Sequence, residues 1–197
     1  MPSLSRIFQI LPVAVLLWMT IGAGFIFRPD VGQRDLRGLG VVATLWGMIL
    51  AVRIGTPAPM WIATVGVAGL LASLVLFHWA AFSIRGRVFS YAGHDDLPQF
   101  VHTAGPYAYV RNPFYASYLL TEISAVVMWP SLWGAVLILL ATCYFQWLAR
   151  FEEAKFARSP VAEAYARYKA RTGRLLPRWQ SRTPASAAPG ASRGSRG

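Results

Sequence analysis

Long hydrophobic runs alternate with short polar connections along most of this 197-residue chain. An α-helix rises 1.5 Å per residue, so about 20 apolar residues cross the roughly 30 Å hydrocarbon core of a bilayer. The pattern therefore predicts an all-α, polytopic membrane protein with about five transmembrane helices. We place these helices at residues 7–27, 39–53, 60–84, 114–129 and 132–150.

Glycine and proline mark the boundaries of several of these helices. Gly105 and Pro106 break any helix that enters from the preceding loop, and Pro113 suits the first turn of the run that follows. Pro130 and Ser131 leave only a two-residue turn between the last two runs. This short turn predicts an antiparallel hairpin of helices.

Two further features concern how helices pack. Gly66 and Gly69 in the third run are small enough to permit close contact with a neighbouring helix. After the fifth run, residues 161–171 have the spacing of an amphipathic helix, and Gly173 is a plausible C-cap. We expect this segment to be a C-terminal helix on the cytoplasmic surface of the membrane.

Composition agrees with a membrane protein, because 55% of the residues are hydrophobic, 14% are charged and the mean hydropathy is +0.43. We expect residues 1–179 to form a single membrane-embedded domain.

The first run is longer than the apolar region of a typical signal peptide, so we expect it to be retained. Residues 180–197 are mainly Ser, Ala, Pro, Gly and Arg without periodicity, which predicts a disordered basic tail.

The formal net charge of +11 is distributed in a way that argues against nucleic acid as a partner. From Arg150 onward there are 11 of the 19 basic residues, beside the end of a membrane helix. Membrane lipids of negative charge or an anionic cofactor are the partners that we expect. With five crossings, 17 of the 19 basic residues share the side of the C-terminus, so the positive-inside rule makes that side cytoplasmic. In a bacterium this membrane would be the inner membrane.

A metal site is not expected. His94, Asp95, Asp96 and His102 lie in the longest polar connection, but their spacing matches no common ligand pattern. The single cysteine, Cys143, lies in an apolar run. A disulfide within the chain is therefore impossible, and a thiolate metal cluster is too.

Polar residues with useful chemistry gather at one side of the predicted membrane. Arg111 and three tyrosines lie at the mouth of the fourth helix, and the hairpin returns Glu152 and Glu153 to the same side. An arginine suits the carboxylate of S-adenosylmethionine, acidic groups suit its ammonium or ribose, and aromatic faces suit its adenine and sulfonium. Taken separately, the same residues are also typical of an interfacial anchor and of a solvated helix end.

The order of these residues is more specific. The chain has Gly-Pro-Tyr at 105–107, Arg-x-Pro-x-Tyr at 111–115, Glu-Glu at 152–153, Tyr-x-x-Tyr-x-x-Arg at 165–171 and then Pro177. This order resembles the isoprenylcysteine carboxyl methyltransferase and phospholipid methyltransferase superfamily, over residues 100–178. The resemblance implies S-adenosylmethionine as methyl donor, and a lipophilic small molecule, a lipid or a lipidated protein as acceptor.

The resemblance also implies roles for single residues. Cofactor binding would fall to Gly105, Pro106, Tyr107, Arg111, Asn112, Tyr115, Glu152 and Glu153. Tyr165 and Tyr168 would contact the substrate, and Arg171 would position it for catalysis. Asn112 departs from the family, which usually has histidine there, so any role that needs an imidazolium is lost.

The reaction implied is in-line methyl transfer from a sulfonium to an oxygen, sulfur or nitrogen nucleophile. Such a transfer needs alignment and desolvation more than acid–base catalysis, because the leaving thioether is neutral. Arg171 would hold the acceptor if its nucleophile is a carboxylate. Glu122 is the carboxyl group expected within the hydrocarbon zone, and we assign it to the catalytic chamber rather than to hydrogen-bonded packing.

Two other functions stay open from the sequence. An NADPH-dependent membrane reductase of sterol or steroid type would share the hairpin and the basic tail, although this chain is short for one. A non-catalytic lipid-binding membrane protein would fit if Asn112 marks a site that has lost its activity.

Overall fold

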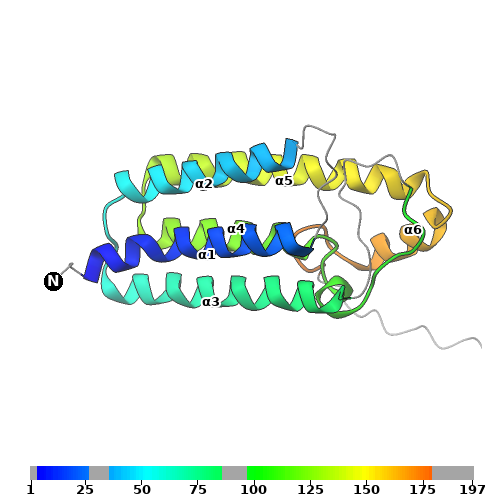
Figure 1. Ribbon diagram of the computed structural model, residues 1–197, viewed down its shortest axis with the longest axis horizontal. Coiled ribbons are helices and arrows are strands. Elements are labelled where there is room, and N and C mark those ends of the chain that lie inside the picture. Colours follow the sequence, from blue (N-terminus) through cyan, green and yellow to red (C-terminus); the bar gives the residue numbers. More distant parts are fainter. Residues whose placement is uncertain (1–3, 27–35, 86–96, 179–197) are drawn as a thin grey trace, which may run out of the picture.

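A computed structural model describes residues 4–26, 36–85 and 97–178, and within these ranges the fold is helical without strands (Figure 1). The predicted all-α class is therefore confirmed. One short 3-10 helix, η1, covers Gly105–Ala108. The described residues form six α-helices: α1 Leu4–Ile26, α2 Leu36–Ile54, α3 Met60–Ser83, α4 Pro113–Met128, α5 Leu132–Ala157 and α6 Ala162–Arg171.

Three of the described helices are long and apolar enough to cross a membrane. They are α3, α5 and the Gln9–Ile26 part of α1. An integral membrane protein is what these helices indicate. A crossing by α2 and by the 16-residue α4 stays a prediction.

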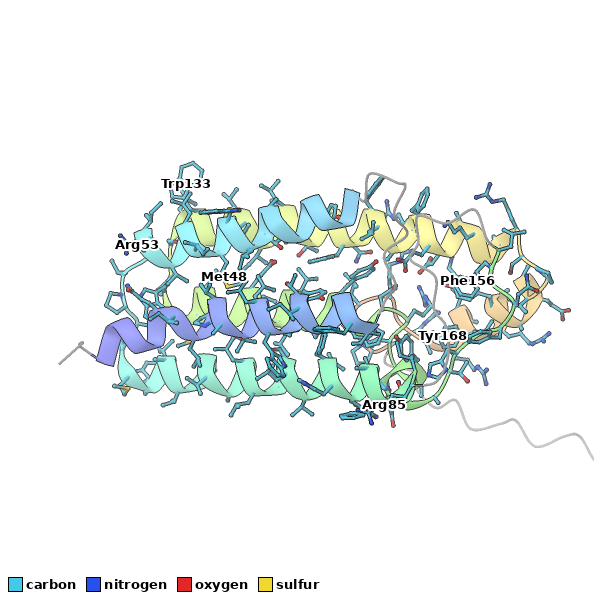
Figure 2. All side chains as sticks on the ribbon, viewed as in Figure 1. Met48, Arg53, Arg85, Trp133, Phe156 and Tyr168 are labelled. Atoms are coloured by element: carbon cyan, nitrogen blue, oxygen red, sulfur yellow. The ribbon has the colours of Figure 1, made fainter. Side chains whose placement is uncertain are left out.

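The five long helices lie alongside one another, and α4 occupies the centre of the bundle (Figure 1). It contacts α1, α2, α3 and α5, and its closest association is with α3. Figure 2 shows Arg53 and Trp133 at one end of the bundle and Phe156 and Tyr168 at the other. The predicted hairpin of α4 and α5 turns at the first of these ends, so both helices reach the second end together.

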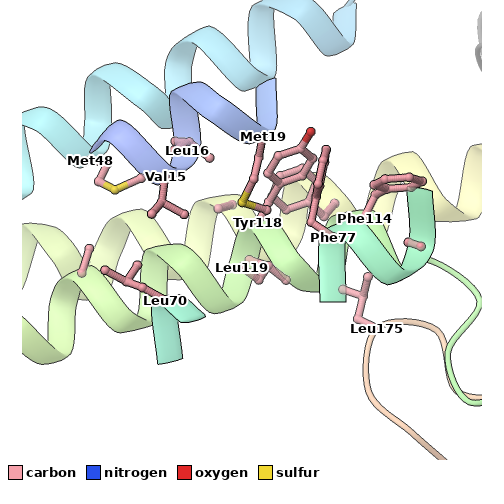
Figure 3. Packing of buried hydrophobic residues seen from close by; sticks show 14 of the residues in the cluster. Val15, Leu16, Met19, Met48, Leu70, Phe77, Phe114, Tyr118, Leu119 and Leu175 are labelled. Carbon is pink, nitrogen blue, oxygen red and sulfur yellow. The ribbon is translucent and has the colours of Figure 1, made fainter. Parts of the chain in front are cut away.

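Small residues allow the close approach of α3 and α4. A Cβ added at Gly66 would lie 2.3 Å from Met128 Cγ, and one at Gly69 would lie 2.2 Å from Ser124 Oγ. The two glycines therefore act as the sequence predicts. Phe77 fills the adjoining core and meets Phe114 edge-on, with 5.2 Å between the ring centroids (Figure 3).

Helix α5 continues beyond the predicted end at residue 150 and stops at Ala157. Glu152 and Glu153 therefore lie inside the helix rather than after it, on neighbouring positions that point in different directions. Other parts of the sequence analysis fall outside the described residues. These are the candidate metal ligands His94, Asp95 and Asp96 and the predicted tail at 180–197.

Candidate active site

The Gly-Pro-Tyr turn packs closely against the end of α3 because Gly105 has no Cβ. Gly105 has φ +60°, in the left-handed region that glycine enters without strain. A Cβ there would lie 2.8 Å from Ser83 Cβ and 3.2 Å from Trp79 Nε1. Only glycine satisfies both the backbone and the space, so Gly105 and the buried Pro106 hold the polar segment against the end of α3.

The same polar segment pairs with the end of the chain. We call residues 172–178 the C-terminal strap. Arg111 N donates to Gly173 O at 2.8 Å, Asn112 N donates to Arg174 O at 3.1 Å, and Gly173 N donates to Tyr109 O at 3.2 Å. The side chain of Asn112 adds a bond from Nδ2 to Arg174 O at 3.2 Å. The amide at this position thus holds the strap, a role that requires a donor and no charge.

Glu153 is the centre of a buried ionic cluster. Its Oε1 accepts from Arg111 Nε at 3.0 Å and from Arg174 Nε at 2.9 Å. Its Oε2 accepts from Arg174 Nη2 at 2.9 Å and lies 3.3 Å from Lys169 Nζ. The side chains of Glu153 and Arg111 are only 7% and 8% exposed. We call these four residues the Glu153 cluster.

The cluster gives Arg111 and Glu153 a structural role. Besides Glu153, Arg111 Nη1 donates to the carbonyls of Lys169, at 3.2 Å, and Thr172. These contacts use nearly all of the N–H groups of its guanidinium. Arg111 therefore joins α4, α5 and the strap, and a direct contact of Arg111 or Glu153 with a cofactor stays a prediction.

Glu152 is the more accessible acidic residue of the pair. It is partly exposed, and Tyr115 OH donates to its Oε1 at 2.6 Å. The ring of Tyr115 stacks on Phe145 with 5.3 Å between centroids. The hairpin thus brings the predicted residues Tyr115 and Glu152 into direct contact at the end of the bundle.

The tyrosines of α6 are buried packing groups. Tyr165 stacks on Phe156 with 4.2 Å between centroids, and Tyr168 OH donates to Tyr107 O at 2.7 Å. Burial raises the pKa of Tyr168 to about 12. Burial also raises the pKa of Tyr165 and that of Tyr107, where the negative charge of Glu152 adds to the effect. These phenols stay neutral at physiological pH, and Tyr165 and Tyr168 fasten α6 to the bundle.

The structure does not bring the two predicted catalytic residues together. Arg171 is exposed at the end of α6. Glu122 is 1% exposed on α4, and neither of its carboxyl oxygens has a hydrogen-bond partner within the described residues. It lies seven residues from Tyr115, about 10 Å deeper in the bundle at 1.5 Å per residue.

An apolar groove of about 470 Å³ opens beside this polar end of the bundle. Side chains of α3, α4, α5, the η1 region and the strap line it. Its walls include Trp79 from α3, Leu119 from α4 and Leu175 from the strap. Thr142 and Gln146 of α5 contribute polar groups. Glu122 is not in its walls, so α4 separates the predicted chamber residue from the groove.

The sequence analysis did not identify Gln146 and Arg174, whose contact links the groove to Glu153. Arg174 Nη1 donates to Gln146 Oε1 at 2.9 Å while the rest of the guanidinium binds Glu153. Arg174 lies in the strap, where no helical periodicity indicates which way a side chain points. Its position directly after Gly173, the predicted C-cap, was the one available signal, because the chain changes direction where a helix ends. In the structure α6 ends at Arg171, and its C-cap is Thr172 rather than Gly173.

Comparison with known families places this geometry in context. The sequence model described as phospholipid methyltransferase matches residues 61–161, slightly more than half of the chain. The matched range runs from the start of α3 through the Gly105 turn, α4 and all of α5. A comparison with curated proteins gave no match.

Proposed function

The chain belongs to the phospholipid methyltransferase family, and we propose that it transfers a methyl group from S-adenosylmethionine to a lipophilic acceptor in the membrane. The observation that carries this proposal is the position of the apolar groove beside the polar end of the bundle. Gln146 lines the groove and, through Arg174, is connected to Glu153, which is adjacent to Glu152 in α5. We place the water-soluble donor at Glu152 and the membrane-soluble acceptor in the groove, so that the two would meet at this end of α5.

The residues at the polar end suit the donor. Glu152 is a partly exposed carboxylate held by Tyr115, and it can accept hydrogen bonds from the ammonium or the ribose hydroxyls. Tyr107 and Tyr115 provide aromatic faces near it, which suit an adenine or a sulfonium. When bound, the donor would supply the methyl group and leave as a neutral thioether. Gly105, Pro106, Arg111, Asn112 and Glu153 hold the frame around Glu152.

The groove suits the acceptor because its walls are mainly apolar, and Thr142 and Gln146 supply polar groups on the side of α5. An acceptor chain held there is shielded from water, and its reactive group is directed toward the end of α5. Alignment and exclusion of water are what an in-line transfer to a nucleophile requires. We assign Tyr165 and Tyr168 to the support of α6, and Arg171 to the exposed surface rather than to the groove.

Binding of S-adenosylhomocysteine, the demethylated donor, tests the proposal. Isothermal titration of the purified protein should detect binding, and Glu152→Gln should weaken it about tenfold or more, because a charge-assisted hydrogen bond is lost. Glu163→Gln is a matched control on exposed α6, where Glu163 pairs only with Arg167 within the described chain. Binding of NADPH in place of S-adenosylhomocysteine would instead favour a reductase. If the protein binds neither compound, a non-catalytic lipid-binding protein is favoured.

We further propose that all five long helices cross the membrane, with the polar end of the bundle in the cytoplasm. With five crossings, 17 of the 19 basic residues of the sequence would lie on this side, and the positive-inside rule favours that orientation. In a Cys143→Ser background, a cysteine at the exposed Thr56 should react with a membrane-impermeant maleimide only from the outer side. Labelling only from the cytoplasmic side would reverse the orientation.

A further inference from the structure

The orientation of the Gln146 amide is determined by its partner. Arg174 Nη1 donates to Gln146 Oε1 at 2.9 Å. A guanidinium has donors and no acceptor, so the amide oxygen and not its NH₂ group must face Arg174. The NH₂ group makes no hydrogen bond to another described residue, and Gln146 lines the groove. The two N–H groups of the Gln146 amide are therefore available as hydrogen-bond donors to a ligand in the groove.

Arg174 is itself held in one orientation. It binds both oxygens of Glu153 through Nε and Nη2, and its side chain remains 22% exposed. Three of its five N–H groups are used by Glu153 and Gln146, which leaves two without a partner among the described residues. Arg174 does not itself line the groove, so it acts on the groove through the Gln146 amide that it orients.

The charges nearby favour an anion. Three cationic side chains surround the one carboxylate of Glu153, and they remain in excess when the neighbouring Glu152 is included. A cationic headgroup would meet the donors of Gln146 and this excess positive charge. An oxygen of a carboxylate or a phosphate would accept hydrogen bonds from the NH₂ group of Gln146 and would balance part of the charge.

We propose that Gln146, oriented by Arg174, is a specificity-determining residue that selects an acceptor carrying a carboxylate or phosphate next to its apolar chain. The inference rests on the proposed function of the groove as the acceptor site. Gln146 supplies the donor, Arg174 fixes its direction, and the apolar walls hold the chain. The same arrangement disfavours acceptors whose only polar group is a cation.

Trp79 in the groove wall makes the binding measurable. Four amphiphiles with one brominated alkyl chain are added to the full chain in dodecyl maltoside micelles, whose heads carry no charge. The four differ only in the head, which is a carboxylate, a phosphate, a trimethylammonium or a hydroxyl. Bromine quenches tryptophan fluorescence at short range. The part of the quenching that disappears in Trp79→Phe measures binding in the groove, and the part that remains comes from the other tryptophans. We expect the carboxylate or the phosphate to bind about tenfold or more tightly than the trimethylammonium compound. The tighter of the two anions identifies the head.

Variants of α5 separate specificity from folding. Gln146→Glu places a carboxylate against Arg174 and should abolish the preference for the anionic heads. Arg150→Gln changes an exposed residue of α5 one helical turn away and outside the groove, and it should leave the preference unchanged. Arg178→Gln removes a positive charge from the exposed end of the strap and should also leave it unchanged.

Two results would overturn the inference: equal binding of the four heads to the wild type, or a preference that survives Gln146→Glu. S-adenosylhomocysteine binding is measured in the same samples. Its absence in the wild type would contradict the proposed function. Its presence without a preference among the heads would contradict only the role of Gln146.

Discussion

Two buried carboxyl groups on neighbouring helices have opposite surroundings. Glu153 of α5 is 7% exposed and binds two arginines and a lysine, whereas Glu122 of α4 is 1% exposed and binds no described residue. Removing a carboxylate from water costs several kcal/mol unless partners replace the lost hydration. Glu153 has such partners, and Glu122 does not.

The difference follows from position in the bundle. At the end of α5 the chain can bring cations from three segments. Arg111 comes from the segment before α4, Lys169 from α6 and Arg174 from the strap. In the middle of α4 the neighbours are other apolar helices. Glu122 shares the face of α4 that carries Tyr115 and Tyr118, whose rings stack on Phe145 of α5. Burial alone therefore does not indicate what a membrane carboxyl does, and its partners must be known.

The largest effect is expected from Glu153→Gln. This change leaves Arg111 and Arg174 facing a neutral amide in a buried site, and it should lower the free energy of unfolding by about 3 to 5 kcal/mol. Unfolding by SDS in mixed micelles, followed by circular dichroism, measures this. The control is Glu163→Gln, whose exposed pair with Arg167 is worth about 0.3 to 0.5 kcal/mol. Similar effects for the two variants would mean that the Glu153 cluster does not stabilise the fold.

A smaller effect is expected from Arg111→Lys. Lysine keeps the charge but cannot reach Glu153 and the carbonyls of Lys169 and Thr172 together, so the variant should lose about 1 to 3 kcal/mol. Affinity for S-adenosylhomocysteine should fall as well, since Arg111 supports the frame around Glu152. The same unfolding and titration measurements apply, with exposed Arg167→Lys as the control. Unchanged stability with strongly reduced affinity would instead indicate direct cofactor contact.

The smallest effect on stability is expected from Glu122→Gln. The carboxyl has no hydrogen bond to lose within the described chain, so the free energy of unfolding should change by less than about 1 kcal/mol. Thr121→Val, at the adjacent position, removes a hydrogen bond, because Thr121 Oγ1 donates to Ser73 Oγ at 2.9 Å. This variant should lower the free energy of unfolding by about 1 kcal/mol. A fall in methyl transfer without a fall in stability would support the predicted place of Glu122 in the catalytic chamber. A stability loss above about 2 kcal/mol would show that Glu122 has a partner after all.

Local chemistry alone determined several features of this protein. The length of each hydrophobic run and the positions of glycine and proline predict the helix ends to within a few residues of the observed ones, except at the end of α5. Polar residues such as Glu152 and Glu153 do not end a helix when its buried face continues, and Glu153 is on that face. The motifs at 105–115 and 152–153 indicated the family, which the match at residues 61–161 confirms.

Tertiary structure decided which polar side chains bind one another. From the sequence, Arg111 and Glu153 both suit a ligand, but the fold brings them within 3.0 Å and they satisfy each other. Arg174 and Gln146 gave no pattern, because their contact joins an irregular strap to a helix 28 residues earlier. Helical periodicity identifies the direction of a side chain only within its own helix. Contacts across the bundle depend on where each segment returns, and only the packed structure contains that information.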